Sequence, residues 1–195
     1  MNKLDFDFSI KEPKINNKIS FQNLQKEDLK LLLKWLNNDF VKQWYYKNGK
    51  NNENYIYEDI EKKYLPRVLK QDPTNSFLII FENEKIGYIQ WYLLKDYPEY
   101  NKYVDGGNDS AGIDLFIGEE AFIHKGLGSK IIKKFIKENI FCNNWINRCI
   151  IGPEPKNIVA IKAYNKAGFK YIKTVQIPNE EEPEYIMELK KIFNR

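Results

Sequence analysis

The apolar and polar positions in the first third of the chain predict one strand followed by two helices. Residues 19–24 alternate apolar and polar side chains, which is the period of a half-buried strand. Between residues 29 and 36, leucines recur at helical spacing and mark the apolar face of a helix. A second helix is expected over residues 54–70, where Pro66 should kink or divide it.

The middle of the chain predicts three further strands. Residues 76–82 and 86–94 are apolar and aromatic, and the connection between them has the length of a hairpin turn. Residues 95–110 contain proline and glycine and are expected to form an irregular loop. Residues 111–117 are then the next strand, because they are again mostly apolar.

The last third of the chain alternates helices and strands. A helix with an apolar face follows the glycines at 126–128, and a strand at 148–151 comes next. A helix at 157–167 and strands near 170–177 and 184–190 complete the chain. This order predicts an α+β fold in which helices flank a mixed, mostly antiparallel central sheet.

Length and composition favour one soluble domain. A chain of 195 residues is long enough to bury one sizeable core. Residues 1–17 are polar and irregular, so we expect an N-terminal extension followed by a single domain over residues 18–195, with a loop at 48–52. The apolar stretches are too short to cross a bilayer, and the start of the chain lacks a signal-peptide core. We therefore expect a cytoplasmic protein with no membrane partner.

Charge and metal-ligating residues exclude two classes of function. The net charge of +4 is mild, and lysines are interspersed with acids rather than gathered in a stripe, which argues against nucleic-acid binding. Cys142, Cys149 and His124 are too few for a zinc-ligand cluster, so no metal is expected. The two cysteines are expected to be reduced and partly buried thiols.

The segment from Lys125 to Ser129 indicates an anion-binding turn. Gly126 and Gly128, on either side of Leu127, lie where a loop passes into a helix. Glycines there let backbone N–H groups converge on an anion, and the positive end of the helix adds a favourable field. The order of residues excludes a P-loop, and the lack of a third glycine excludes a dinucleotide fingerprint.

A second motif follows about thirty residues later, and it makes the function of the glycine turn more specific. Asn157, Ala160 and Tyr164 recur at helical spacing before Gly168 and Phe169. Together the two motifs resemble the GNAT superfamily of acyl-CoA-dependent N-acyltransferases, over roughly residues 19–190. One departure is Ile123, where the superfamily often has Arg or Gln.

The resemblance implies acetyl-CoA as co-substrate and assigns the residues to parts of it. The glycine turn would hold the pyrophosphate, Asn157 would contact the pantetheine arm, and Ala160 would allow its close approach. Tyr164 would lie near the thioester sulfur and protonate the departing thiolate, although its residue type also suits plain core packing. A backbone N–H of the strand around Phe116 and Ile117 would stabilise the oxyanion.

The acceptor is indicated by acidic residues. A protein that is basic overall gathers carboxylates between residues 96 and 120, where they suit either a solvated loop or the attraction of a polycationic amine. Asp114 differs from the others because it lies within a strand between apolar neighbours, which is costly unless it faces a polar cleft. It is the leading candidate to accept the amine proton or to anchor the ammonium. Glu99, Asp105 and Asp109 are further candidate substrate contacts.

Motifs around Gln90, Asp114, Gly126 and Tyr164 are most similar to the aminoglycoside 6′-N-acetyltransferases. This resemblance implies direct transfer of acetyl to the 6′-amine of an aminoglycoside in a ternary complex, and thereby antibiotic resistance. Asp114 would be the base and Gln90 would lie by the acceptor. The aromatic candidates for the wall of the drug site, which would otherwise be core residues, are Trp44, Tyr45 and Tyr92.

Two departures from that family bear on the acceptor. Leu115 stands where Gln is frequent, and Gly152 stands before Pro153 where Asp is common. Glu154 is a candidate replacement for the missing carboxylate. Other small-molecule amines, protein amines and a non-catalytic acetyl-CoA sensor remain alternatives, and the protein is expected to be a monomer or homodimer.

Overall fold

A computed structural model describes residues 18–45, 53–178 and 180–192. The extension predicted for residues 1–17 and the loop predicted at 48–52 lie outside this described part. The helices are α2 (Leu29–Leu36), α3 (Asp39–Lys42), α4 (Tyr57–Val68), α5 (Pro98–Val104), α6 (Gly128–Phe135) and α7 (Ile158–Ala167), with a π-helical turn η4 (Ile136–Ile140) after α6. The strands are β1 (Ile19–Asn23), β2 (Asn75–Phe81), β3 (Glu84–Leu93), β4 (Ser110–Ile117), β5 (Arg148–Ile151), β6 (Lys170–Val175) and β7 (Glu184–Lys190).

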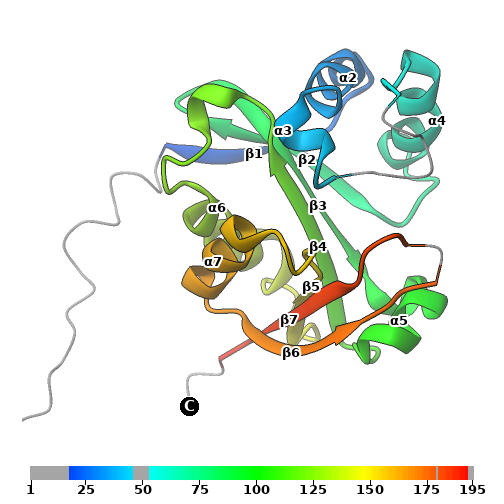
Figure 1. Cartoon of the computed structure of the whole chain (residues 1–195), viewed down its shortest axis with the longest axis vertical. Coiled ribbons are helices and arrows are strands. Elements are labelled where there is room, and N and C mark those ends of the chain that lie inside the picture. The colour runs from blue at the N-terminus through cyan, green and yellow to red at the C-terminus, as the bar shows by residue number, and fades with distance from the viewer. Residues whose placement is uncertain (1–17, 46–52, 179, 193–195) are drawn as a thin grey trace, which may run out of the picture.

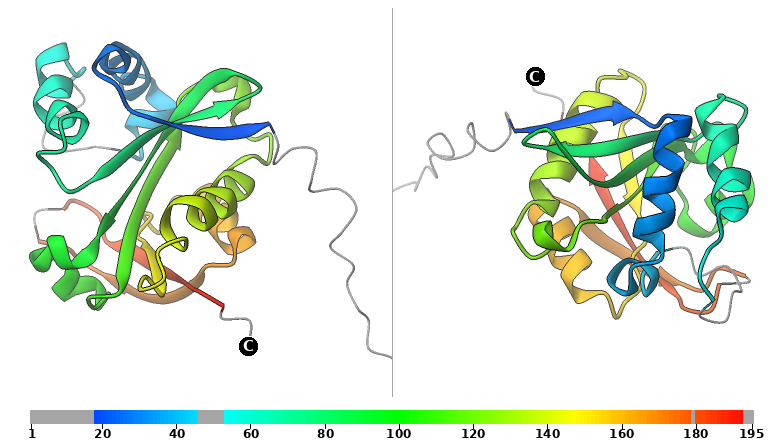
Figure 2. Two further views of the ribbon diagram at one scale, coloured as in Figure 1. Left: turned by 180° about the vertical axis from the view of Figure 1, so that it is seen from behind. Right: turned by 90° about the horizontal axis from the view of Figure 1, so that it is seen from above.

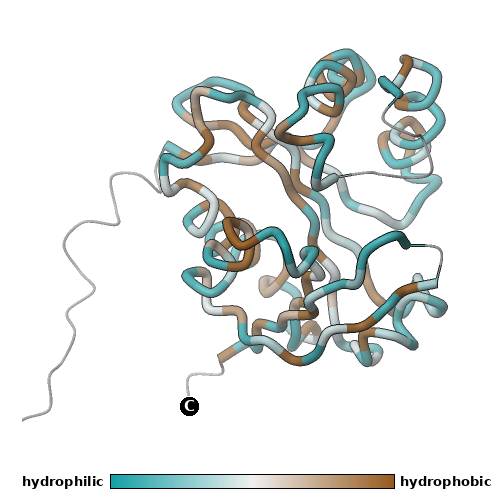
Figure 3. The backbone as a smooth tube through the Cα atoms, viewed as in Figure 1, coloured by the Kyte–Doolittle hydropathy of each residue, from teal (hydrophilic) through white to brown (hydrophobic). Residues whose placement is uncertain are grey.

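The strands form one seven-stranded sheet in the order β1-β2-β3-β4-β5-β7-β6. Every neighbouring pair is antiparallel except β4 and β5, so the predicted mixed, mostly antiparallel sheet is confirmed. Hydrophobic stretches follow the central strands, and the outer loops are largely hydrophilic (Figure 3).

Helices cover both faces of the sheet. Side chains alternate between the two faces along each strand, and apolar side chains on each face pack against helices. Leu78 and Tyr88 pack with α2 and α4 in one core, whereas their neighbours Ile79 and Ile89 pack with α6 and α7 in the other. The two halves of the sheet lie at an angle, and α6 and α7 lie between them on one side (Figure 1 and Figure 2).

The sheet divides between β4 and β5. Their parallel pairing covers only Ser110–Gly112 against Arg148–Ile150, although β4 continues to Ile117. Beyond Gly112 the structure pairs β4 with β3 alone. Main-chain groups of the second half of β4 therefore face an opening rather than a neighbouring strand, and a ligand can bind there.

Three predicted elements are corrected by the structure. The expected irregular loop over 95–110 contains α5, which begins at Pro98, a residue suited to the first helical position. Pro66 does not divide α4, because it lies in the last turn of a helix that ends at Val68. The hairpin turn between β2 and β3 is only two residues long, and both have positive φ angles, the geometry that matches the twist of adjoining strands.

Candidate active site

The opening between β4 and β5 leads to a cavity of about 940 Å³. Its walls come from the second half of β4, the α6 turn, the start of α7 and the segment before β7. Nearly all predicted donor-site residues line it, and these are Phe116, Ile117, Gly126, Leu127, Gly128, Ser129, Asn157, Ala160 and Tyr164. Lys125, also predicted for this site, does not line the cavity, and its side chain is exposed.

One end of the cavity is suited to an anion. Gly126 has φ +70°, a conformation that side chains disfavour, and a Cβ there would meet nothing within 4 Å. The turn therefore opens onto free space immediately before α6 begins at Gly128, where helix N–H groups lack intrahelical acceptors. Lys162 and Lys166 of α7 also line this cavity and add positive charge.

Asn157 has a structural function at the start of α7. Its Oδ1 accepts a hydrogen bond from the Ala160 N–H at 3.1 Å and caps the helix. At the other end of α7, Gly168 has φ +106° and ends the helix, and Phe169 is fully buried. These two ends fix α7 against the sheet and hold Tyr164 at the cavity.

Tyr164 lines the cavity while only 8% of its surface is exposed. Burial raises the pKa of its phenol, and the nearby Asp114 carboxylate acts in the same direction. The phenol therefore carries its proton at neutral pH and is available as a proton donor.

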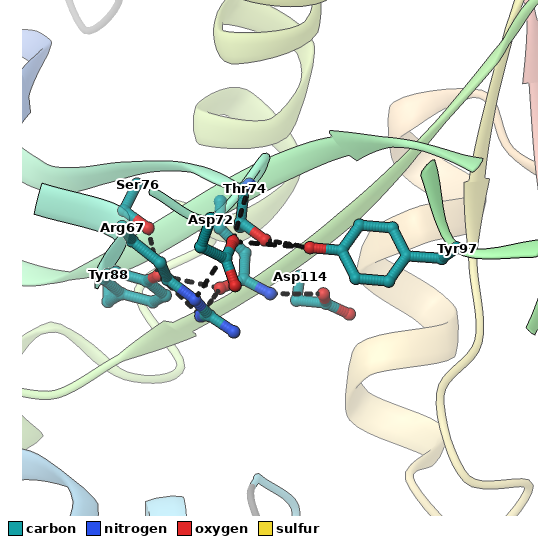
Figure 4. Close-up of polar contacts among 8 residues, drawn as sticks. Arg67, Asp72, Thr74, Ser76, Tyr88, Tyr97 and Asp114 are labelled. Carbon is teal, nitrogen blue, oxygen red and sulfur yellow. Dashed lines mark hydrogen bonds and ion pairs between the residues drawn. The ribbon is translucent and has the colours of Figure 1, made fainter. Parts of the chain in front are cut away.

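Asp114 lines the cavity and is held by a network of hydrogen bonds (Figure 4). Gln90 lies directly opposite it across the β3–β4 pair, and Gln90 Nε2 donates to Asp114 Oδ2 at 2.8 Å. Gln90 Oε1 accepts from Arg67 Nη1 at 2.6 Å and from Tyr88 Oη at 2.7 Å. Gln90 thus orients the Asp114 carboxylate, and the hydrogen bonds from Arg67 and Tyr88 fix the orientation of the Gln90 amide.

Burial raises the pKa of Asp114, the direction that makes a carboxylate a better base. The hydrogen bond from Gln90 and the charges of Arg67 and Lys63 act in the opposite direction. Lys63 is itself affected, because burial and the nearby Arg67 lower its pKa to about 7. Arg67 and Lys63 were missed by the sequence analysis, since both read as ordinary surface positions of a charged helix.

Aromatic side chains surround Asp114. Trp44 and Tyr45 line the cavity, and the Tyr45 ring packs against Phe116 with centroids 4.8 Å apart. Tyr92 is not among the lining residues; its ring lies over Gly112, where a Cβ would come within 2.4 Å of it. Tyr92 therefore packs beside the acidic site.

Apart from Asp114, the acidic residues of the segment 96–120 do not line the cavity. Glu99 pairs with Lys102, Asp105 with Lys173, and Asp109 accepts a hydrogen bond from Asn147. The structure does not bring Glu99, Asp105 and Asp109 to the cavity, because α5 and its flanking turns hold them elsewhere.

A different acidic segment lies at the cavity instead. The lining includes Glu154, as predicted, and also Glu180–Glu182 and Glu184, which the sequence analysis missed. The signal was visible as a run of acids immediately before the last strand. Burial raises the pKa of Glu184 to about 7, and a hydrogen bond from Tyr100 opposes this shift.

Cysteine, metal and membrane features contribute nothing further to this site. Cys149 is buried, which raises its pKa, and Cys142 is exposed; both are free thiols. Among the described residues no group of three or more His, Cys, Asp or Glu is placed to hold a metal ion. No helix in the described ranges is both long and apolar enough to cross a membrane.

The chain is similar in sequence to several known proteins. It is 28% identical over 182 residues to aminoglycoside N(6′)-acetyltransferase type 1 of Klebsiella pneumoniae, covering 92% of this chain and 87% of that protein. A kanamycin resistance protein of Rhizobium radiobacter is 31% identical over 84 residues, 43% of this chain and 76% of that protein.

Solved structures of aminoglycoside acetyltransferases are also similar to this chain. The aminoglycoside acetyltransferase AAC(6′)-Ib in complex with ribostamycin and coenzyme A superposes with a TM-score of 0.76 at 26% identity, covering 89% of this chain and 94% of that one. Its complex with coenzyme A and kanamycin has a TM-score of 0.74. Residues 24–177 match the family model of the acetyltransferase (GNAT) domain. The chain therefore belongs to the GNAT family of acetyltransferases.

Proposed function

We propose that this protein transfers an acetyl group from acetyl-CoA to the 6′-amine of an aminoglycoside and so confers resistance to the antibiotic. The observation that carries the proposal is the polarity of the cavity. Its lining combines the start of helix α6 and Lys162 and Lys166 with the carboxylates of Asp114 and Glu184. An anionic nucleotide donor and a polycationic acceptor suit these two kinds of charge. Relatives named as aminoglycoside acetyltransferases support the choice of acceptor.

On the donor side, the residues that line the cavity fit acetyl-CoA. The glycine turn and the start of α6 would hold the pyrophosphate, with Asn157 and Ala160 beside the pantetheine arm. Main-chain N–H groups around Phe116 and Ile117, on the part of β4 that β5 does not pair, would hold the thioester carbonyl oxygen.

On the acceptor side, the amine nitrogen attacks the thioester carbon while Asp114 accepts its proton, directly or through water. The new C–N bond forms, the C–S bond breaks, and Tyr164 gives its proton to the departing thiolate. Solvent then returns a proton to Tyr164. Holding both substrates in one cavity supplies much of the rate by orientation, and no covalent enzyme intermediate is required.

A thiol-release assay with a panel of amines tests this function. Kanamycin and tobramycin should release coenzyme A, whereas analogues with a hydroxyl group at the 6′ position and lysine-containing peptides should be inert. Release with peptides alone would favour a protein acetyltransferase. Binding of acetyl-CoA without release on any amine would favour a sensor, and either result would contradict the proposal.

The remaining parts of the proposal concern the location, the oligomeric state, the partners and the domain organisation of the protein. We propose that the protein acts in the cytoplasm on a small molecule, as a monomer or homodimer, without a nucleic-acid or membrane partner. The interspersed surface lysines support the choice of a small molecule over nucleic acid. We also propose that residues 18–195 are one domain.

A further inference from the structure

We propose that Glu184 is a second anionic anchor for the acceptor, which binds an ammonium group other than the one acetylated, and that Gly152 exists in this chain to admit it. This inference rests on the proposed function and deepens it.

The first step is the contact between Gly152 and Glu184. A Cβ on residue 152 would lie 2.1 Å from Glu184 Oε2 and 2.9 Å from Glu184 Cδ. The Glu184 carboxylate therefore occupies the space that any side chain at 152 would enter. The start of β7 and the end of β5 lie side by side, with Ile151 opposite Met187 and the Tyr185 N–H bonded to the Pro153 carbonyl.

The second step is the direction of the Glu184 carboxylate. Tyr100 Oη donates to Glu184 Oε2 at 2.7 Å, which fixes that oxygen over the end of β5. Both Glu184 and Gly152 line the cavity, as does Asp114. Gly152 lies two residues beyond the last β4–β5 pair, and so does Asp114. The two carboxylates thus lie on either side of the opening between β4 and β5.

The third step is the charge of Glu184. Burial raises its pKa to about 7, and the Asp114 carboxylate adds to the shift. Both carboxylates line the same cavity, and their like charges repel each other. Two carboxylates in one cavity, both poorly solvated, gain from a cation beside each of them. A ligand with several ammonium groups can place one beside each carboxylate, whereas a monoamine supplies only one cation.

Glu154 is the weaker candidate for the same task. It follows Pro153 in the chain and lines the cavity, but the space above Gly152 is already filled by the Glu184 carboxylate. The carboxylate over Gly152 is therefore that of Glu184, from the neighbouring strand β7.

Steady-state kinetics with kanamycin as the varied acceptor test the anchor. Glu184→Gln keeps the shape and the Tyr100 contact, and it should raise the KM for kanamycin on the order of tenfold or more, as for a lost hydrogen bond between charged groups. The KM for acetyl-CoA and kcat should stay unchanged. Gly152→Ala should raise the same KM, because its Cβ displaces the carboxylate. Glu138→Gln, an equal charge change at a residue paired with Lys134 outside the cavity, is the control.

A carboxylate swap separates an anchor from a purely structural residue. The double variant Gly152→Asp/Glu184→Ala returns a carboxylate to the site from β5 and should recover part of the lost affinity. An unchanged KM for kanamycin in Glu184→Gln, or an equal rise in the KM of both substrates, would overturn the inference. If the wild-type protein acetylates no aminoglycoside, the proposed function fails. Calorimetric titration of kanamycin into the wild type and into Glu184→Gln then tests the anchor, and equal dissociation constants for the two proteins overturn the inference.

Discussion

At the scale of single residues, the site depends on the environment of one half-buried carboxylate, that of Asp114. Asp114 loses solvation on burial, which raises its pKa, while Gln90 and Arg67 stabilise its charge. A folded-state pKa above the usual value of an aspartate means that this carboxyl contributes stability only at low pH, and the contribution is lost as pH rises through the folded pKa. The protein therefore gives up stability at neutral pH to hold a base.

Asp114→Asn separates activity from stability. Loss of the base should reduce kcat by about 100-fold or more, within the usual range for general base catalysis. The melting temperature at pH 7.5 should be equal to or higher than that of the wild type, because the amide needs no charge solvation. Thiol release and thermal unfolding measure the two effects, and full activity in the variant would remove Asp114 from the mechanism.

Arg67 is one of the groups that oppose the effect of burial on the pKa of Asp114. Its positive charge lowers the pKa of Asp114, so Arg67→Met should raise that pKa and move the acid limb of the kcat/KM profile to higher pH. Arg67→Lys, which keeps the charge, should move the limb less. An acid limb at the wild-type position in Arg67→Met would show that this guanidinium does not act on the base.

At the scale of elements, the sequence predicts most of the sheet but not the acceptor contacts. The ranges expected for 148–151 and 184–190 match β5 and β7, because strong apolar patterns mark them. Helix α5 was missed because its seven residues, which begin with Pro98, are mostly polar or aromatic and carry no apolar period. Glu184 was missed because its contact with Gly152 joins residues far apart in the sequence, which no local pattern records.

The cap of α7 gives a prediction for one element. Asn157→Ala removes the acceptor for the Ala160 N–H and should cost about 1 kcal/mol of stability. Asn157→Ser retains a capping oxygen and should keep the melting temperature. If Asn157 also contacts the pantetheine arm, both variants should raise the KM for acetyl-CoA. A normal KM in the serine variant would limit Asn157 to capping.

At the scale of the whole molecule, function follows from where the sheet divides. The pairing of β4 and β5 stops after three residues, and the second half of β4 lines one cavity together with the start of α6 and the carboxylates of Asp114 and Glu184. In the proposed function, the donor and the acceptor meet in this cavity beside the second half of β4.

The site of acetylation on the product tests this account most directly. Kanamycin incubated with acetyl-CoA and the protein should yield one monoacetylated product, with the acetyl group on the 6′-nitrogen when assigned by NMR. An acetyl group on another nitrogen, or recovery of unmodified kanamycin while another amine is acetylated, would contradict the assignment of the acceptor.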